Sequence, residues 1–338
     1  MHRHGSEERA AGLVKVYAFF GHEQWPAESV VRWAVLAERL GFDGVMVSDH
    51  TQPWVDDHGA AGFAFATLGA VASATERLRM ATGVVTPLFR YHPAVVALAA
   101  STIARLSGGR FDLGVGTGER INEAPLGLPF PGYDERAARM AEALDIIRGL
   151  LDGHEMDYDG GHYRTEGFRL AAPPTSPVPI WMAAQGPRSA ALAGGSADAV
   201  ITSVKDPQET LDRVLGPARE AAAAAGRPPT PVVATRWAVH AASSDEAWQA
   251  LLPWRGLRVP GRDRATGPRE LRLQADRMPR REVLAAFPRA AGAAELVEVY
   301  RPLVDELCAE VVVAQLASVD PAATLEMFAV EVLPELRR

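Results

Sequence analysis

Short runs of apolar and β-branched residues alternate with longer segments of helical periodicity along the chain. The pattern predicts strands at 14–20, 44–50, 79–86, 110–118, 179–184, 199–203, 231–241 and 310–317. The most regular helical patterns occupy 28–41, 93–106 and 135–153. Near-continuous apolar strands separated by helices are typical of a parallel sheet that is buried on both faces.

The number of repeating units favours a closed barrel. About eight βα units fit the 338 residues, which points to an α/β fold with a single (β/α)8 TIM barrel. Periodicity alone leaves an open doubly wound sheet as the alternative. We expect residues 1–13 to be a disordered N-terminal extension and residues 14–338 to form the barrel domain.

Two segments interrupt the alternation. Residues 154–170 read as a small hairpin that turns at Asp159-Gly160-Gly161. Residues 255–290 are rich in Arg, Pro and Gly and read as a long lid-like loop with a short helix, inserted before the last βα unit. Loops of this length in compact domains are usually functional lids or flexible segments.

Composition narrows the classes of protein. Hydrophobic residues make up 48% of the chain and the net charge is −7, so a large core is available and nucleic-acid binding is not expected. No apolar run is long enough for a signal peptide or a membrane span, which predicts a cytoplasmic protein without a membrane partner. Cys308, the single cysteine, is interpreted as a small buried residue of a helix. We expect no metal site.

Polar residues gather where the predicted strands end. In a barrel the chemistry lies at the carboxyl ends of the strands, so these positions predict an active-site mouth. They are Glu23, Ser48, Asp49, His50, Thr86, Thr117, Glu119, Gln185, Gly186, Thr202, Ser203 and Lys205.

Two of these residues are candidates for proton transfer. His50 titrates near neutrality and can accept a hydroxyl proton while a hydride leaves the same carbon; alternatively it caps the strand end. Glu119 follows GVGTG (114–118), which departs from the dinucleotide fingerprint G-x-G-x-x-G. Glycines at this strand and at Gly83 would instead let a flat ring approach the backbone, with Glu119 as an acid. Alternatively, Glu119 is a carboxylate at a helix N-terminus and Gly83 is a simple strand glycine.

Two segments are candidates for anion binding. Residues 185–189 lie between a strand and a helix, where free backbone amides form a candidate phosphate cradle for a cofactor tail. A second candidate site, for the anionic group of a phosphorylated or carboxylated substrate, consists of Thr202, Lys205 and Arg262. Lys205 is one of only two lysines, although a solvated surface charge is the simpler interpretation.

Taken together, these stretches resemble the luciferase-like superfamily and, within it, the coenzyme F420-dependent glucose-6-phosphate dehydrogenase family. The resemblance is carried from about residue 14 onward by SDHTQPW (48–54), TGVVTPLFRYHPAVVA (82–97), GRFDLGVGTGERINE (109–123), YDGGHYRTEGF (158–168) and PIWMAAQGPRSAALAG (179–194). It implies that His50 is the base, that Trp54 stabilises the charged intermediate and that Glu23 orients the site. It also implies that Glu119 protonates a ring nitrogen of the reduced coenzyme.

The resemblance further implies how the ligands are held. Coenzyme F420, an 8-hydroxy-5-deazaflavin, would be preferred to FMN and would be bound by the matching residues, with a non-proline cis peptide at Gly83-Val84. These residues are Asp49, Gly83, Val84, Thr117, Asn122, Gln185 and Gly186. The phosphate grip is matched in part by Thr202, Lys205 and Arg262, whereas Ala286 stands where the family has an arginine.

The expected function is hydride transfer between the deazaflavin ring and the carbinol carbon of a sugar phosphate, or of another secondary alcohol or hemiacetal. The alternatives are an FMN-dependent monooxygenase of the same fold, an F420-dependent reductase of secondary metabolism, and a barrel that binds a flavin without catalysis. The partner is a small-molecule substrate, and the resemblance implies a homodimer.

Overall fold

Eight parallel strands close into a barrel in the computed structural model, which describes residues 13–338. The predicted N-terminal extension falls almost wholly on residues 1–12, which lie outside the described residues. Neighbours around the barrel run β9-β11-β1-β2-β3-β4-β7-β8, and β8 returns to β9. The strands are β1 (Lys15–Phe20), β2 (Gly44–Val47), β3 (Arg79–Thr82), β4 (Phe111–Val115), β7 (Ile180–Ala183), β8 (Ala199–Ser203), β9 (Val232–His240) and β11 (Val311–Ala317).

All eight predicted strands are present, and closure of the ring excludes the open sheet. Helices cover the outside of the barrel because each buries an apolar stripe against it. The larger ones are α1 (Ala27–Arg39), α2 (Ala64–Ala74), α3 (Pro93–Leu106), α5 (Tyr133–Leu151), α6 (Pro187–Ser196), α8 (Gly216–Ala224) and α12 (Ala293–Asp305). Shorter ones are α4 (Arg120–Glu123), η1 (Ala124–Leu126), α7 (Pro207–Thr210), η2 (Leu211–Leu215), α13 (Pro321–Met327), η5 (Phe328–Val332) and α14 (Leu333–Leu336).

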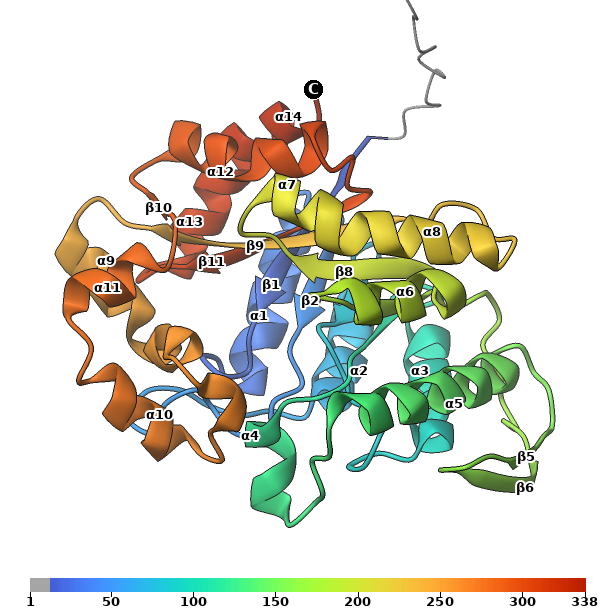
Figure 1. Cartoon of the computed structure of the whole chain (residues 1–338). Helices are drawn as coiled ribbons and strands as arrows, with labels where there is room; N and C mark the ends of the chain where they lie inside the picture. The colour runs from blue at the N-terminus through green and yellow to red at the C-terminus, as the bar shows by residue number, and fades with distance from the viewer. Residues whose placement is uncertain (1–12) are drawn as a thin grey trace, which may run out of the picture.

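The hairpin is confirmed, whereas the second insertion is more ordered than predicted. β5 (Met156–Asp159) and β6 (Arg164–Phe168) pair in antiparallel fashion. The second insertion is largely helical rather than a long loop (Figure 1). α9 (Ser244–Leu251) precedes it, and its elements are η3 (Leu252–Arg258), η4 (Arg262–Arg264), α10 (Pro268–Ala275), α11 (Arg280–Ala285) and β10 (Arg289–Ala290). We call the part from η3 to α11 the lid.

The lid shares a hydrophobic cluster with the barrel and is also attached to it by ion pairs. Trp254, Leu271 and Phe287 are buried in a hydrophobic cluster that also includes Trp54. Arg255 is only 3% exposed and pairs with Asp57 at 2.5 Å, in the loop that follows β2. This packing explains why an Arg- and Pro-rich segment folds, since most of its few apolar residues are buried in this cluster, with Leu273 as an exposed exception.

The interpretation of Cys308 is wrong. The side chain is exposed, because α12 ends at Asp305 and Cys308 lies in the turn before β11 with a φ of 53°. Among residues 13–338 no helix has the length and apolar character needed to cross a membrane.

Close contact between β3 and β4 requires a glycine at position 114. The Thr82 hydroxyl donates to the Gly114 carbonyl at 2.7 Å and accepts from its amide at 2.8 Å. A Cβ on Gly114 would press on the carbonyl oxygen of Thr82 and lie 3.2 Å from Cδ1 of Ile201.

We expect Gly114→Ala to lower the free energy of unfolding by about 2 kcal/mol, because the obstructing atom is backbone and cannot rotate away. Urea denaturation would measure this change. Gly69→Ala in α2 is the matched control, since a Cβ there meets nothing within 4 Å. A loss of stability no larger than that of the control would contradict the prediction.

Candidate active site

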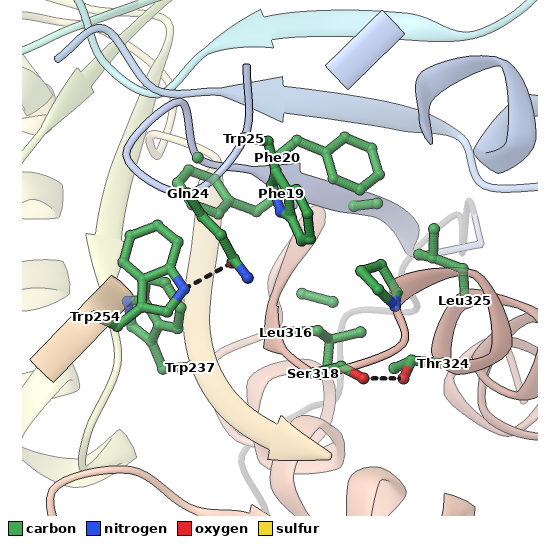
Figure 2. Close-up of a pocket in the computed structure, with 14 residues that line it drawn as sticks. Phe19, Phe20, Gln24, Trp25, Trp237, Trp254, Leu316, Ser318, Thr324 and Leu325 are labelled. Carbon is green, nitrogen blue, oxygen red and sulfur yellow. Dashed lines mark hydrogen bonds between the residues drawn. The ribbon is translucent and has the colours of Figure 1, made fainter. Parts of the chain in front are cut away.

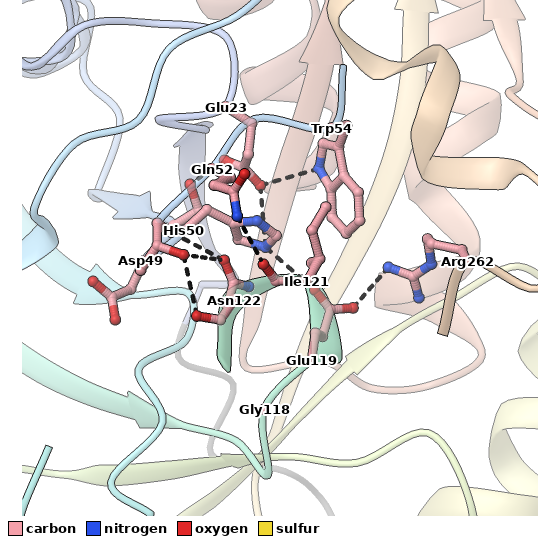
Figure 3. Close-up of polar contacts among 12 residues, drawn as sticks. Glu23, Asp49, His50, Gln52, Trp54, Gly118, Glu119, Ile121, Asn122 and Arg262 are labelled. Carbon is pink, nitrogen blue, oxygen red and sulfur yellow. Dashed lines mark hydrogen bonds and ion pairs between the residues drawn. The ribbon is translucent and has the colours of Figure 1, made fainter. Parts of the chain in front are cut away.

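Three loops bring a histidine and two glutamates together at the carboxyl end of the barrel. Glu23 follows β1, His50 follows β2 and Glu119 follows β4 (Figure 3). Nε2 of His50 lies 3.5 Å from Oε1 of Glu23 and 3.3 Å from Oε2 of Glu119. A proton added at Nε2 therefore faces two carboxylates.

Glu23 is fixed by two donors. It is 3% exposed, its Oε2 accepts a short hydrogen bond from the Ser48 hydroxyl, and its Oε1 accepts from Nε1 of Trp54 at 3.2 Å. The Trp54 ring in turn lies 4.7 Å from the His50 ring, measured between centroids. The four residues that the sequence predicts to be catalytic, His50, Glu119, Trp54 and Glu23, thus form one connected cluster.

Arg262 joins this cluster from the lid. Its Nη1 lies 2.7 Å from Oε1 of Glu119, and its guanidinium carbon lies 5.0 Å from the centre of the Trp54 ring. Burial alone would raise the pKa of the Glu119 carboxyl, but Arg262 and His50 lower it to about 2. Glu119 is therefore an anion at neutral pH while Arg262 and His50 are its partners.

The neighbouring carboxylates also control His50. Burial alone would lower the pKa of His50, but Glu23, Glu119 and Asp49 raise it above its usual value. The opposite ring nitrogen, Nδ1, is buried and has no hydrogen-bond partner within residues 13–338. The site thus stabilises the imidazolium, which is what a residue that accepts a proton during a reaction requires.

Beside His50 lies a groove of about 400 Å³ with glycines in its wall. Gly83, Gly116 and Gly118 expose backbone to the groove, and the Gly83-Val84 peptide bond is cis, as the resemblance implies. A Cβ on Gly116 would lie 2.6 Å from Cγ2 of Val84. The groove is lined by Asp49, His50, Gly83, Val84, Thr86, Gly116, Thr117, Gly118, Glu119, Asn122, Tyr133, Ala183, Gln185 and Ser189.

Six of the seven predicted cofactor residues line this groove. The exception is Gly186, which is the N-cap of α6 next to Gln185. Asn122 also ties the loop after β2 to α4, because its Oδ1 accepts from the amide of Thr51 at 3.0 Å. The groove wall and the catalytic loop are therefore held by the same side chain.

Sequence reasoning missed one residue that lines the groove and one that holds a lining residue from behind. Arg90 pairs with the buried Asp49 at 2.9 Å, and Tyr133 at the start of α5 lines the groove. Burial raises the pKa of Asp49 despite this cation. No strand-end signal marks either residue; the stretch 82–97, already noted for its resemblance, was the available hint for Arg90.

The three predicted anion-binding residues are divided between two cavities. Thr202 and Lys205 line one of about 190 Å³, together with Asp206, Glu209 and Arg213. Arg262 lines another of about 270 Å³, together with Trp54 and Glu119. The structure therefore does not assemble Thr202, Lys205 and Arg262 into a single grip.

An aromatic cavity beside Gly21 and Gln24, in the loop after β1, is too small for a substrate. Phe19, Trp237 and Trp254 surround a volume of about 20 Å³, enough for about one water molecule (Figure 2). Nε1 of Trp254 donates to Oε1 of Gln24 at 2.8 Å. This cluster packs the lid against the loop that carries Glu23.

Known proteins share this architecture. A family model described as luciferase-like monooxygenase matches residues 12–302. An F420-dependent glucose-6-phosphate dehydrogenase from Beutenbergia cavernae is 37% identical over 320 residues, 93% of this chain and 95% of that protein. An F420-dependent hydroxymycolic acid dehydrogenase from Mycobacterium tuberculosis is 35% identical over 331 residues, 97% and 89% of the two chains. The structure of an F420-dependent secondary alcohol dehydrogenase with an F420-acetone adduct superposes with a TM-score of 0.88 at 25% identity, covering 97% and 100%.

We expect Arg262→Ala to raise the pKa of Glu119 from its value of about 2, because the cation that favours the carboxylate is removed. Titration of the glutamate side-chain carboxyls by 13C NMR would show the shift. Arg264→Ala is the control, since Arg264 belongs to the same turn and forms no ion pair with any residue of 13–338. An unchanged Glu119 titration in Arg262→Ala would show that the pair does not set this pKa.

Proposed function

The chain belongs to the luciferase-like monooxygenase family, and within it we propose an F420-dependent dehydrogenase that acts on a secondary alcohol or hemiacetal. The observation that carries the proposal is the imidazole of His50, held between two carboxylates beside a groove walled by glycines. The named relatives act on glucose 6-phosphate, hydroxymycolic acid and a secondary alcohol. These molecules share a hydroxyl group, so the substrate class is a CH–OH donor.

The groove fits the coenzyme. Its backbone wall at Gly83, Gly116 and Gly118 leaves room for a flat ring system, and Asp49 and Asn122 offer polar contacts at the edge. Gly186 starts α6, whose first backbone amides suit an anionic tail. When bound, coenzyme F420 supplies a deazaflavin ring that exchanges a hydride with the substrate carbon.

The protein's own residues accept the proton of the substrate hydroxyl and stabilise the resulting charge. We assign His50 as the base that accepts the hydroxyl proton at Nε2, where Glu23 and Glu119 stabilise the resulting imidazolium. Glu23 keeps its orientation because Ser48 and Trp54 both donate to it. The Trp54 ring face beside His50 adds a favourable contact with a cation.

We expect His50→Asn to lower kcat by about 10²- to 10⁴-fold, because the hydroxyl proton then has no acceptor. Turnover of F420 with sugar phosphates and secondary alcohols would be followed through the visible absorbance of the oxidised coenzyme. His154→Asn is the control, since His154 is exposed and does not line the groove.

Coenzyme binding separates this proposal from its alternative within the family. The dissociation constant for F420 should be similar in His50→Asn and the parent protein, since the other groove-lining residues are unchanged and asparagine keeps a polar side chain at position 50. Tight binding of FMN without binding of F420, or full turnover by His50→Asn, would overturn the proposal.

We also propose a homodimer, with α3 in its interface. Val95, Leu98 and Leu106 are 54%, 49% and 56% exposed, and their spacing places them on one face of the helix. A second copy of the chain would cover this apolar stripe.

The double substitution Val95→Glu and Leu98→Glu should shift a dimer to monomer, because it places charges in a desolvated interface. Sedimentation velocity would measure the mass. Glu substitution at exposed Leu273, on the lid, is the control. A monomeric parent protein, or a dimer that survives the double substitution, would contradict the assignment.

A further inference from the structure

A second cavity adjoins the coenzyme groove on the lid side. It measures about 270 Å³ and shares Gly118 and Glu119 with the groove, so the two compartments meet at the catalytic cluster. It is lined by Trp54, Gly118, Glu119, Arg120, Ile121, Phe130, Arg136, Arg262 and Asp263. Figure 3 shows Arg262 on the far side of Glu119 from His50.

This cavity carries positive charge that the protein does not neutralise. Within residues 13–338 no acidic side chain forms an ion pair with Arg120 or Arg136, whereas Arg262 is paired with Glu119. Arg136 donates instead to backbone oxygens, at 3.0 Å to Thr117 and 3.2 Å to Pro131. With Asp263 counted, the lining still holds one more cation than anions.

The two cations differ in their other contacts. Nη1 and Nε of Arg136 are used by the loop before α4 and α5, and no hydrogen bond within the described chain uses its Nη2. Arg120 has no side-chain hydrogen bond to any of residues 13–338. Both side chains are only partly exposed. Bulk water therefore competes less strongly with a bound anion there than it would at a fully exposed arginine.

The remaining walls are apolar and flat. The rings of Trp54 and Phe130 line the cavity, and the guanidinium carbon of Arg136 lies 4.3 Å from the centre of the Phe130 ring. A ligand that combines an anionic group with a ring or short carbon skeleton would satisfy both kinds of wall.

We propose that this cavity binds the substrate, with Arg120 and Arg136 receiving an oxyanion of the substrate, a carboxylate or a phosphate monoester. The inference rests on the proposed function, because it places the carbinol carbon at His50 and the anion on the lid side. Once bound, the oxyanion competes with Glu119 for Arg262, since the same guanidinium lines the cavity.

The cavity that contains Thr202 and Lys205 is the competing location. Its lining includes the acidic residues Asp206 and Glu209, although Glu209 is paired with Arg213 at 3.0 Å. Lys205 is exposed there, whereas Arg120 and Arg136 are partly buried, and Arg136 lies beside the Phe130 ring. An oxyanion therefore gains more from the arginine cavity.

Calorimetric titration of the full-length protein without coenzyme tests the site directly. Inorganic phosphate and benzoate serve as probes at low ionic strength, where screening is weak. Arg120→Ala should weaken binding of both probes about tenfold, the effect of one charge-assisted hydrogen bond. Arg264→Ala, which removes a lid cation outside the cavity, should leave both affinities within about twofold.

Arg136→Lys provides a second variant that retains the charge but loses the planar fork. It should weaken phosphate binding by a smaller factor than Arg120→Ala, and its thermal unfolding would verify that the loop before α4 is intact. No measurable binding by the parent protein, or a loss caused by Lys205→Ala and not by Arg120→Ala, would overturn the proposal. Phosphate binding without benzoate binding would restrict the site to phosphate monoesters.

Turnover measurements then test the anion site and the proposed dehydrogenase activity independently of each other. With F420 present, Arg120→Ala should raise KM for an anionic alcohol about tenfold and leave KM for 2-propanol unchanged. If Arg120→Ala does not weaken binding of phosphate and benzoate, while the parent protein turns over F420, the anion site is rejected and the dehydrogenase assignment stands. If the parent protein does not turn over F420, while Arg120→Ala still weakens binding of phosphate and benzoate, the dehydrogenase assignment is rejected and the anion site stands.

Discussion

The imidazole of His50 lies between two carboxylates, and the chemistry of the site depends on that placement. A closed parallel barrel makes it possible, because the carboxyl ends of β1, β2 and β4 meet at one rim although they are far apart in the sequence. The cluster of His50, Glu23, Glu119 and Arg262 has a net charge of −1 when the imidazole is neutral and is balanced when it is protonated. Protonation of His50 therefore neutralises the excess negative charge of this poorly solvated cluster.

Arg262 makes the electrostatics of this rim dependent on the lid. The lid is held to the loop after β2 by pairs such as Arg255 with Asp57, so the segment that supplies Arg262 is attached to the segment that supplies His50 and Trp54. A substrate anion that draws Arg262 away would release Glu119 from the contact that keeps its pKa low. Under the proposed function, one side chain would thus link substrate binding to the availability of a second proton donor.

Much of the fold was predictable because the eight strands are apolar over most of their length, and strand-end residues such as His50 and Glu119 stand out against that background. The lid helices were not predictable, since their core uses Trp254 and Phe287, which are distant in sequence and embedded in an Arg- and Pro-rich segment. Cys308 was misplaced because apolar neighbours conceal the end of α12. The division of Lys205 and Arg262 between two cavities depends on lid docking, which no local pattern encodes.

The groove proposed for the coenzyme is lined only by residues between Asp49 and Ser189, and none of its lining residues comes from the lid. The arginine cavity, by contrast, takes Arg262 and Asp263 from the lid. The lid thus contributes one wall of the cavity proposed for the substrate and contributes nothing to the lining of the groove proposed for the coenzyme. An exchange of residues 252–285 among relatives would therefore reshape that wall, and the contact of Arg262 with Glu119, while the residues that line the coenzyme groove stay the same.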